Sequence, residues 1–137
     1  MLSPIVTMSA VTGRPSKEKI HKYLFGLKNI GIDQALIYPR SGCEIEYLSD
    51  EWFRVVGYFI DSAIKLDMKL WLYDDFNWPS GDAHGKVSAI EKFRLSSVET
   101  KGENMGRITS KSKHNSSLFG EKYFPNLMSE EAVDYFI

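Results

Sequence analysis

The sequence predicts an α/β fold with a parallel sheet. Three mostly apolar runs, at residues 4–10, 32–38 and 68–73, have the length and composition of strands. Two longer stretches between them carry apolar residues at helical spacing. The resulting β-α-β-α-β order repeats every roughly 30–36 residues, which predicts parallel strands joined by right-handed crossovers. Because the strands are nearly continuous apolar runs, we expect both faces of the sheet to be covered.

The first element, 4–10, is expected to be a buried strand, followed by loop residues from Thr12 to Pro15. Ser16 then has the character of a helix N-cap, and Glu18 lies near the positive end of that helix. Gly31 provides the left-handed residue that ends it. The first helix is therefore expected between Ser16 and Gly31.

The second helix is expected to start after Ser49, with Asp50 and Glu51 in its first turn. It ends at Asp67, which holds the place that Gly31 has in the first repeat and tolerates the left-handed conformation better than most residues. One face of this helix is apolar over three turns and is expected to be buried. Its residues are Trp52, Val55, Val56, Phe59, Ile60 and Ala63.

The third strand leads directly into the most informative stretch, residues 70–85. Its apolar run ends in Asp74 and Asp75, followed by Asn77, Trp78 and a Pro-Ser-Gly turn. Adjacent residues of a strand point to opposite faces, so at most one of the two acids can face a cleft. The strand aromatics at positions 71 and 73 are expected to lie in the core rather than to bind a ligand.

Composition bounds the protein class. The 137 residues suggest one domain of ordinary globular composition, with 43% hydrophobic and 26% charged residues. The net charge of −1 leaves no large basic field for nucleic acid or anionic lipid. Cys43 is the only cysteine, so no internal disulfide can form. With no secretory signal and no apolar run long enough for a bilayer, the sequence predicts a cytoplasmic protein that binds neither nucleic acid nor membrane.

Three segments are expected along the chain. Residues 1–95 hold the β-α-β-α-β pattern, although 87–95 fits either a short helix or a strand. Residues 96–117 are polar and are predicted to be a flexible loop. Residues 118–137 restore apolar side chains and begin another helix after Ser129, with Glu130 in its first turn, as the start of a further element that is cut short.

The carboxyl ends of parallel strands meet at one edge of a sheet, where ligands bind. The expected cleft is rich in carboxylates, with one arginine and aromatic side chains, which suits hydrogen bonding and ring stacking with a sugar. The candidate substrate-binding residues are Arg40, Glu44, Asp74, Asn77 and Trp78. Two alternatives remain open: Asp74 could cap a turn or pair with Arg40, and Glu44 equally fits an exposed extended segment. No G-x-G-x-x-G or P-loop motif is found, which disfavours nucleotide binding.

Three motifs together resemble the catalytic barrel of α-L-rhamnosidase-like glycoside hydrolases and their bacterial relatives. They are Tyr-Pro-Arg-Ser-Gly at 38–42, Tyr-Leu-Ser-Asp-Glu-Trp at 47–52, and Trp-Leu-Tyr-Asp-Asp with Trp-Pro-Ser-Gly at 71–81. The resemblance covers roughly residues 4–88 and implies a partial (β/α)8 barrel. It also implies hydrolysis by carboxylates, with Asp75 as the candidate catalytic residue in the place where many relatives have Glu after Tyr-Asp, and in some members a calcium ion near the site.

A complete barrel of this type needs about 250 residues. The sequence therefore suggests a truncated fragment of a glycoside hydrolase that contributes one wall of a carbohydrate site, with the isolated chain inactive. The alternatives are a small non-catalytic α/β domain that binds a carbohydrate or a partner, and an inactive truncated product. The sugar, the stereochemical outcome and the oligomeric state are left open.

Overall fold

A computed structural model describes residues 5–73, 76, 81–101, 104–111, 113–116, 120–123, 125–126 and 128–136. The chain divides into two compact units, Met1–Phe76 and Asn77–Ile137. The division falls within the 1–95 segment that the sequence treats as one piece. Each unit is described by itself below.

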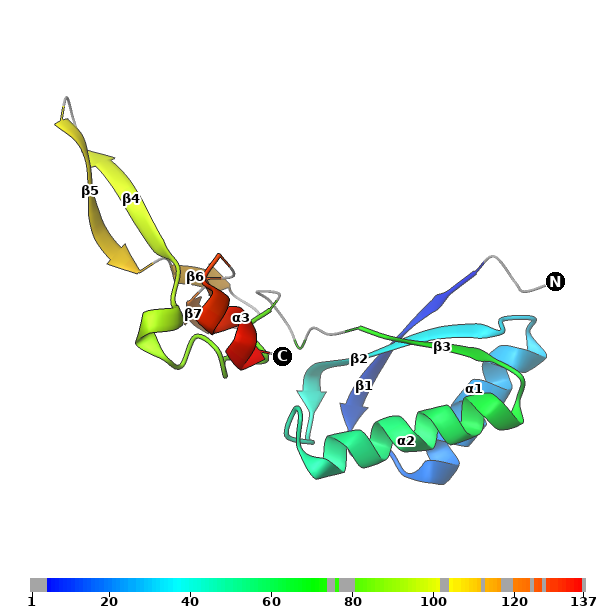
Figure 1. Cartoon of the computed structure of the whole chain (residues 1–137). Helices are drawn as coiled ribbons and strands as arrows, with labels where there is room; N and C mark the ends of the chain where they lie inside the picture. Colours follow the sequence, from blue (N-terminus) through cyan, green and yellow to red (C-terminus); the bar gives the residue numbers. More distant parts are fainter. Residues whose placement is uncertain are drawn as a thin grey trace. The chain divides into compact units, whose positions relative to one another are not determined.

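Unit 1 is an open parallel sheet with two helices. Its elements are β1 (Thr7–Gly13), α1 (Lys17–Asn29), β2 (Gln34–Cys43), α2 (Asp50–Lys65) and β3 (Lys69–Leu72). The strands are parallel in the order β1-β2-β3, and both helices lie on the same face of the sheet (Figure 1). The predicted α/β class with three parallel strands is confirmed.

The strands begin and end at different residues from those predicted. β1 extends to Gly13, through residues expected to form a loop, and β2 continues through Pro39 and Arg40 to Cys43. Proline lacks an N–H for the ladder, so within a sheet it favours irregular positions. In the β1–β2 pairing, Val11 is opposite Pro39 and the register then shifts before Gly13. The extra β2 residues are accommodated at this irregularity, which apolar periodicity alone does not reveal.

Both predicted helix starts are confirmed. The Ser16 hydroxyl accepts a hydrogen bond from the backbone N–H of Lys19 at 3.3 Å, and Ser49 accepts one from Trp52 at 3.2 Å. Each bond satisfies a backbone donor that the first helical turn leaves without a partner, and such a cap stabilises a helix by about 1 kcal/mol.

The two helices also end in the same way. Gly31 has φ of 82° and donates its N–H to the carbonyl of Lys28 at 3.0 Å. Asp67 has φ of 48° and donates to Ile64 at 3.2 Å. In each case the backbone N–H of the next residue forms a second hydrogen bond to a carbonyl further back in the helix. Ile32 donates to Leu27, and Met68 donates to Ala63. The predicted equivalence of Asp67 and Gly31 is confirmed, and Met68 belongs to this helix end rather than to β3.

The two faces of the unit 1 sheet differ. The side chains buried between the sheet and the helices form the core: Val11, Ile20, Leu24, Ala35, Ile37, Trp52, Val55 and Phe59. On the other face, Met8 is 63% exposed and Trp71 is 50% exposed, and Tyr73 beyond β3 is also exposed. The prediction that both faces are covered, with Trp71 and Tyr73 in the core, is wrong for the described part of unit 1. An apolar strand sequence predicts that the strand will be buried, but it does not identify the element that would cover each face of the sheet.

Unit 2 contains two antiparallel strand pairs and short helical segments. After turns at 81–90 come η1 (Glu91–Phe93), β4 (Ser96–Lys101), β5 (Asn104–Lys111), β6 (Lys113–Ser116), β7 (Gly120–Tyr123) and α3 (Glu130–Phe136). β4 pairs with β5 and β6 pairs with β7. The stretch 96–117, predicted as a polar loop, is therefore largely strand. Its β-branched residues, such as Val98 and Ile108, favour extended backbone, and pairing satisfies its hydrogen bonds without many apolar side chains.

The segment 87–95, which fits either a helix or a strand by sequence, forms turns and the short helix η1. Among the described side chains of unit 2, Phe93 is buried, and its ring centroid lies 5.4 Å from that of Tyr135 in α3. The carbonyl of Phe93 also accepts a hydrogen bond from Asn126 at 2.6 Å, and Lys92 forms an ion pair with Glu131. Helix α3 begins directly after Ser129, as predicted.

Candidate functional site

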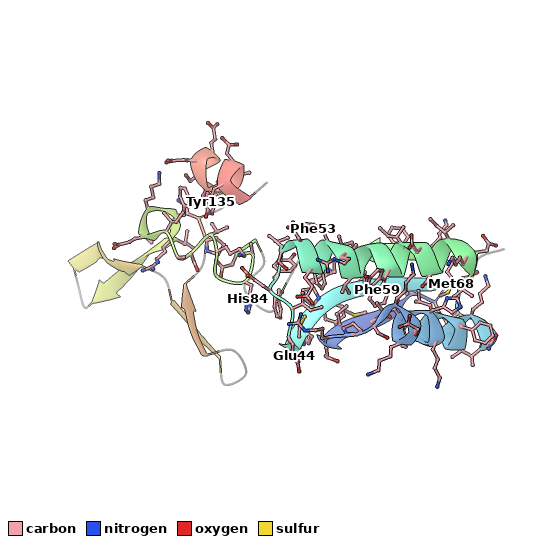
Figure 2. All side chains as sticks on the ribbon, turned by 90° about the horizontal axis from the view of Figure 1, so that it is seen from below. Glu44, Phe53, Phe59, Met68, His84 and Tyr135 are labelled. Carbon is pink, nitrogen blue, oxygen red and sulfur yellow. The ribbon has the colours of Figure 1, made fainter. Side chains whose placement is uncertain are left out.

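The carboxyl ends of the three parallel strands form the edge of unit 1 where a ligand is expected. The segments there are the turn after β1, the loop between β2 and α2, and the residues after β3. Figure 2 shows Glu44 at this end of β2. The contacts between these segments determine which of the predicted site residues are fixed in place.

Arg14 joins the first two of these segments. Its guanidinium forms an ion pair with Glu51 of α2 and donates a second hydrogen bond to the carbonyl of Glu44 at 2.9 Å. The hydrogen bond to Glu51, and then its charge, raise the pKa of Arg14 above its usual value. Arg14 therefore stays cationic and is engaged with the protein. Sequence reasoning missed it, because an arginine before a proline in a turn carries no motif.

An aromatic cluster joins the second and third segments. The buried ring of Tyr47 lies edge-on to Trp52 at 5.5 Å and to Phe76 at 5.7 Å. Phe76 is the residue directly after Asp75, so the chain is anchored on the β2–α2 loop immediately beyond the candidate acids. Such edge-on aromatic pairs contribute about 0.5–1.5 kcal/mol beyond their buried area.

The β2–α2 loop also contains a residue in the left-handed region. Leu48 has φ of 63°, a conformation that costs a residue with a branched side chain about 1–2 kcal/mol. Just after it, the Ser49 hydroxyl lies 2.7 Å from the carbonyl of Glu46, to which it donates, and its backbone N–H binds the same oxygen at 3.2 Å. The tight turn that holds Leu48 thus delivers Ser49 to its capping position on α2.

Two of the six predicted site residues lie in the described part of the chain. Arg40 is exposed within β2 rather than in a loop, because the strand continues past Pro39. Glu44 is exposed directly after the strand, and its backbone is fixed between Gly13 and Arg14. The remaining candidates lie outside the described residues, as does a pairing of Arg40 with Asp74. They are Asp74, Asp75, Asn77 and Trp78.

The open face of the sheet carries a row of aromatic side chains toward the same end. Tyr38 and Tyr73 meet edge-on at 6.0 Å. Trp71 donates its indole N–H to the side-chain carbonyl of Gln34 at 3.3 Å, which fixes the orientation of the ring. Half-exposed rings held in this way present flat surfaces suited to stacking. The signal for them in the sequence, a mostly apolar run, predicted burial instead.

No group of three or more His, Cys, Asp or Glu side chains in the described residues is arranged to hold a metal ion. The calcium implied by the family resemblance stays a prediction. Within the same residues, none of the helices combines the length and the apolar character required to cross a membrane.

No protein-family model matches the chain, and neither does any curated protein or any solved structure. What the protein does is therefore inferred from its motifs and from the geometry described above.

Proposed function

We propose that this chain forms part of a (β/α)8-barrel glycoside hydrolase and supplies one wall of its carbohydrate site. Two things support the proposal: the three sequence motifs at 38–42, 47–52 and 71–81, and the position of the described parts of the first two, which lie in the second half of β2 and in the loop that leads into α2. In a parallel α/β fold, this is the end at which substrates bind.

The observation that carries the proposal is the uncovered face of the sheet. β1, β2 and β3 follow one another in order, both helices lie on one face, and the other face exposes Met8 and Trp71. A barrel buries such a face by closing the sheet on itself, whereas a doubly wound fold covers it with helices. The turn after β1 reads Gly13-Arg14-Pro15 and lacks the glycine fingerprint of the dinucleotide-binding fold, which favours the barrel.

The proposed chemistry follows from the residue types. Asp75 acts as one of the two carboxyl groups of glycoside hydrolysis, and its partner comes from another strand of the barrel. Arg40, Glu44 and Asn77 form hydrogen bonds to sugar hydroxyls. Asp74, which as the neighbour of Asp75 is expected to point to the opposite face, has a structural role. Trp78 stacks on the apolar face of the sugar ring.

Sugar binding by the full chain tests this function. We expect L-rhamnose or a related monosaccharide to bind with a Kd of about 1 mM, measured by calorimetry or by NMR titration. Trp78→Ala and Asp75→Asn should each weaken binding about tenfold, since a lost stacking ring or charged hydrogen bond costs about 1.4 kcal/mol or more. Asp61→Asn is the matched control, because Asp61 is an exposed α2 carboxylate that pairs with Lys17.

The chain alone should not hydrolyse aryl glycosides, because one wall of a site lacks the second carboxyl group. Turnover that Asp75→Asn abolishes would show instead that the chain carries a complete site. Binding of nucleotides with no binding of any monosaccharide would contradict the proposal altogether.

A second candidate function is a non-catalytic α/β domain that binds a partner. The observation that favours it is an apolar groove beside α2 and β3, lined by residues such as Ile60 and Leu72. A chain that binds no sugar but binds a partner through this groove would support the second function over the first.

A further inference from the structure

Helix α2 has a second apolar stripe besides the one that it buries. Its core stripe includes Trp52, Val55 and Phe59, whereas Phe53, Ile60 and Ile64 remain exposed. Figure 2 shows Phe53 and Phe59 on different sides of the helix. The sequence placed Ile60 on the buried face, but it is 45% exposed, so that prediction is wrong. A solvent-facing helix surface normally carries polar residues.

The exposed stripe forms one wall of a groove. The groove has a volume of about 300 Å³ and lies between α2 and β3, the last strand of the sheet. Ile64 is 73% exposed and Leu72 is 58% exposed at its rim. Every residue that lines it is apolar: Ile37, Val56, Ile60, Ala63, Ile64, Met68, Leu70 and Leu72. Contiguous exposed apolar surface of this kind marks interaction sites.

The repeat within unit 1 indicates what fits there. One step earlier along the sheet, β3 pairs in parallel with β2, and α2 packs beside α1 on the same face. The Lys17–Asp61 ion pair, at 3.2 Å, joins those two helices. The groove occupies the next position in this series, beyond α2 and β3. An occupant that continues the existing interface therefore presents a helix with an apolar stripe.

We propose that this groove is a docking site for an amphipathic helix of another polypeptide, whose uncharged stripe covers Ile60, Ile64 and Leu72. The groove has no charged lining residue, so a charged occupant would lose its hydration without gaining a partner. A second copy of this chain fits less well. The apolar side chains of its α1, such as Ile20 and Leu24, are already buried against its own sheet. The proposal does not depend on the sugar chemistry.

The test uses a fluorescein-labelled peptide of residues 49–67, because α2 is the helix that fills the equivalent position one repeat earlier. The full chain is titrated against it by fluorescence anisotropy, with a scrambled peptide of the same composition as control. Saturable binding of the native peptide alone is expected. Ile64→Lys should lower the affinity about tenfold or more, since it places a charge in an apolar interface. Phe25→Lys is the matched control, because Phe25 is an exposed apolar residue of α1 outside the groove.

Ile64 is exposed, so Ile64→Lys should leave the melting temperature and the circular dichroism spectrum unchanged. The proposal is overturned if the native peptide does not bind, or if Ile64→Lys binds it as the unaltered chain does. Sedimentation of the chain alone separates the two occupants. Self-association that Ile64→Lys abolishes would assign the groove to a second copy and contradict a separate partner.

Discussion

The two units of this chain are stabilised in different ways. Unit 1 places two capped helices on a parallel sheet, and its core includes Trp52 and Ile37. In its described residues, unit 2 has two separate two-stranded pairs and the seven-residue helix α3, and Phe93 is buried beside Tyr135 of that helix. Isolated two-stranded hairpins are only marginally stable. The strand pairs of unit 2 therefore need tertiary contacts for stability, whereas in unit 1 the helix caps and the core favour the same structure.

The largest effect is expected at Trp52, a buried residue of α2 that also contacts Tyr47. Trp52→Ala should destabilise unit 1 by about 3–5 kcal/mol, because it removes a large buried side chain and leaves a cavity. Urea unfolding followed by circular dichroism measures the loss. The neighbouring Phe53→Ala is the control, with an expected change below about 0.5 kcal/mol because Phe53 is 55% exposed.

The outcome also tests whether the units are independent. Hydrogen exchange of the Trp52→Ala chain should increase in residues 5–73 and remain unchanged in residues 81–136. Equal losses of protection in both ranges would mean that the two units fold as one.

Phe93→Ala is the reciprocal change in unit 2. It should cost about 3 kcal/mol, since Phe93 is buried and contacts Tyr135. Because isolated two-stranded hairpins are only marginally stable, we expect this one substitution to remove most of the hydrogen-exchange protection in residues 81–136. Protection that persists there would show that the β4–β5 and β6–β7 pairs are stable without the Phe93 cluster.

The difference between the units also explains which parts of the fold the sequence predicts. In unit 1, helix boundaries depend on local chemistry, so Ser16, Ser49, Gly31 and even Asp67 could be identified before the structure. Burial depends on which elements pack together in the fold, so the exposure of Trp71 could not be predicted from the sequence. In unit 2, the pairing of polar neighbouring strands is decided by backbone hydrogen bonds across each pair, which composition does not reveal, and composition alone pointed to a loop.

The candidate site shows the same limit. Parallel topology predicts that the ends of β2 and β3 share one edge, and the Tyr47–Phe76 contact is consistent with that prediction. The bridge from Arg14 to Glu51 and Glu44 joins residues that are far apart in sequence and match no motif. The roles of Asp75 and Trp78 stay predictions from the sequence, because these residues lie outside the described part of the chain.

A smaller effect is expected from substitutions at residues whose backbone is in the left-handed region, one in each unit. Asp67 has φ of 48° in unit 1 and His84 has φ of 60° in unit 2, and glycine adopts both conformations without strain. Asp67→Gly and His84→Gly each relieve this strain and are expected to stabilise the chain by up to about 1 kcal/mol. The larger conformational entropy of glycine in the unfolded chain reduces this gain. Thermal unfolding of both variants measures the gain. Gly31→Ala is the converse control. Gly31 has φ of 82°, so alanine at this position should destabilise the folded chain by about 1 kcal/mol. Stabilisation at His84 without stabilisation at Asp67 would mean that the aspartate side chain compensates for the strain.

The smallest effect concerns the pH dependence of α1 in unit 1. A hydrogen bond to its own backbone N–H, and then one from the Ser16 hydroxyl, lower the pKa of Glu18 below its usual 4.5. A carboxyl group with a lowered pKa stabilises the folded state above pH 4.5, and this contribution is lost as the pH falls through the folded-state value. The melting temperature of the native chain should therefore exceed that of Glu18→Gln at pH 7, and the two should converge as the pH falls well below 4.5. Because Glu18 is fully exposed, the difference is small, and NMR titration of its carboxyl carbon is the direct measurement. Ser16→Ala should shift that titration back toward 4.5, and a midpoint unmoved by Ser16→Ala would assign the shift to the backbone bond alone.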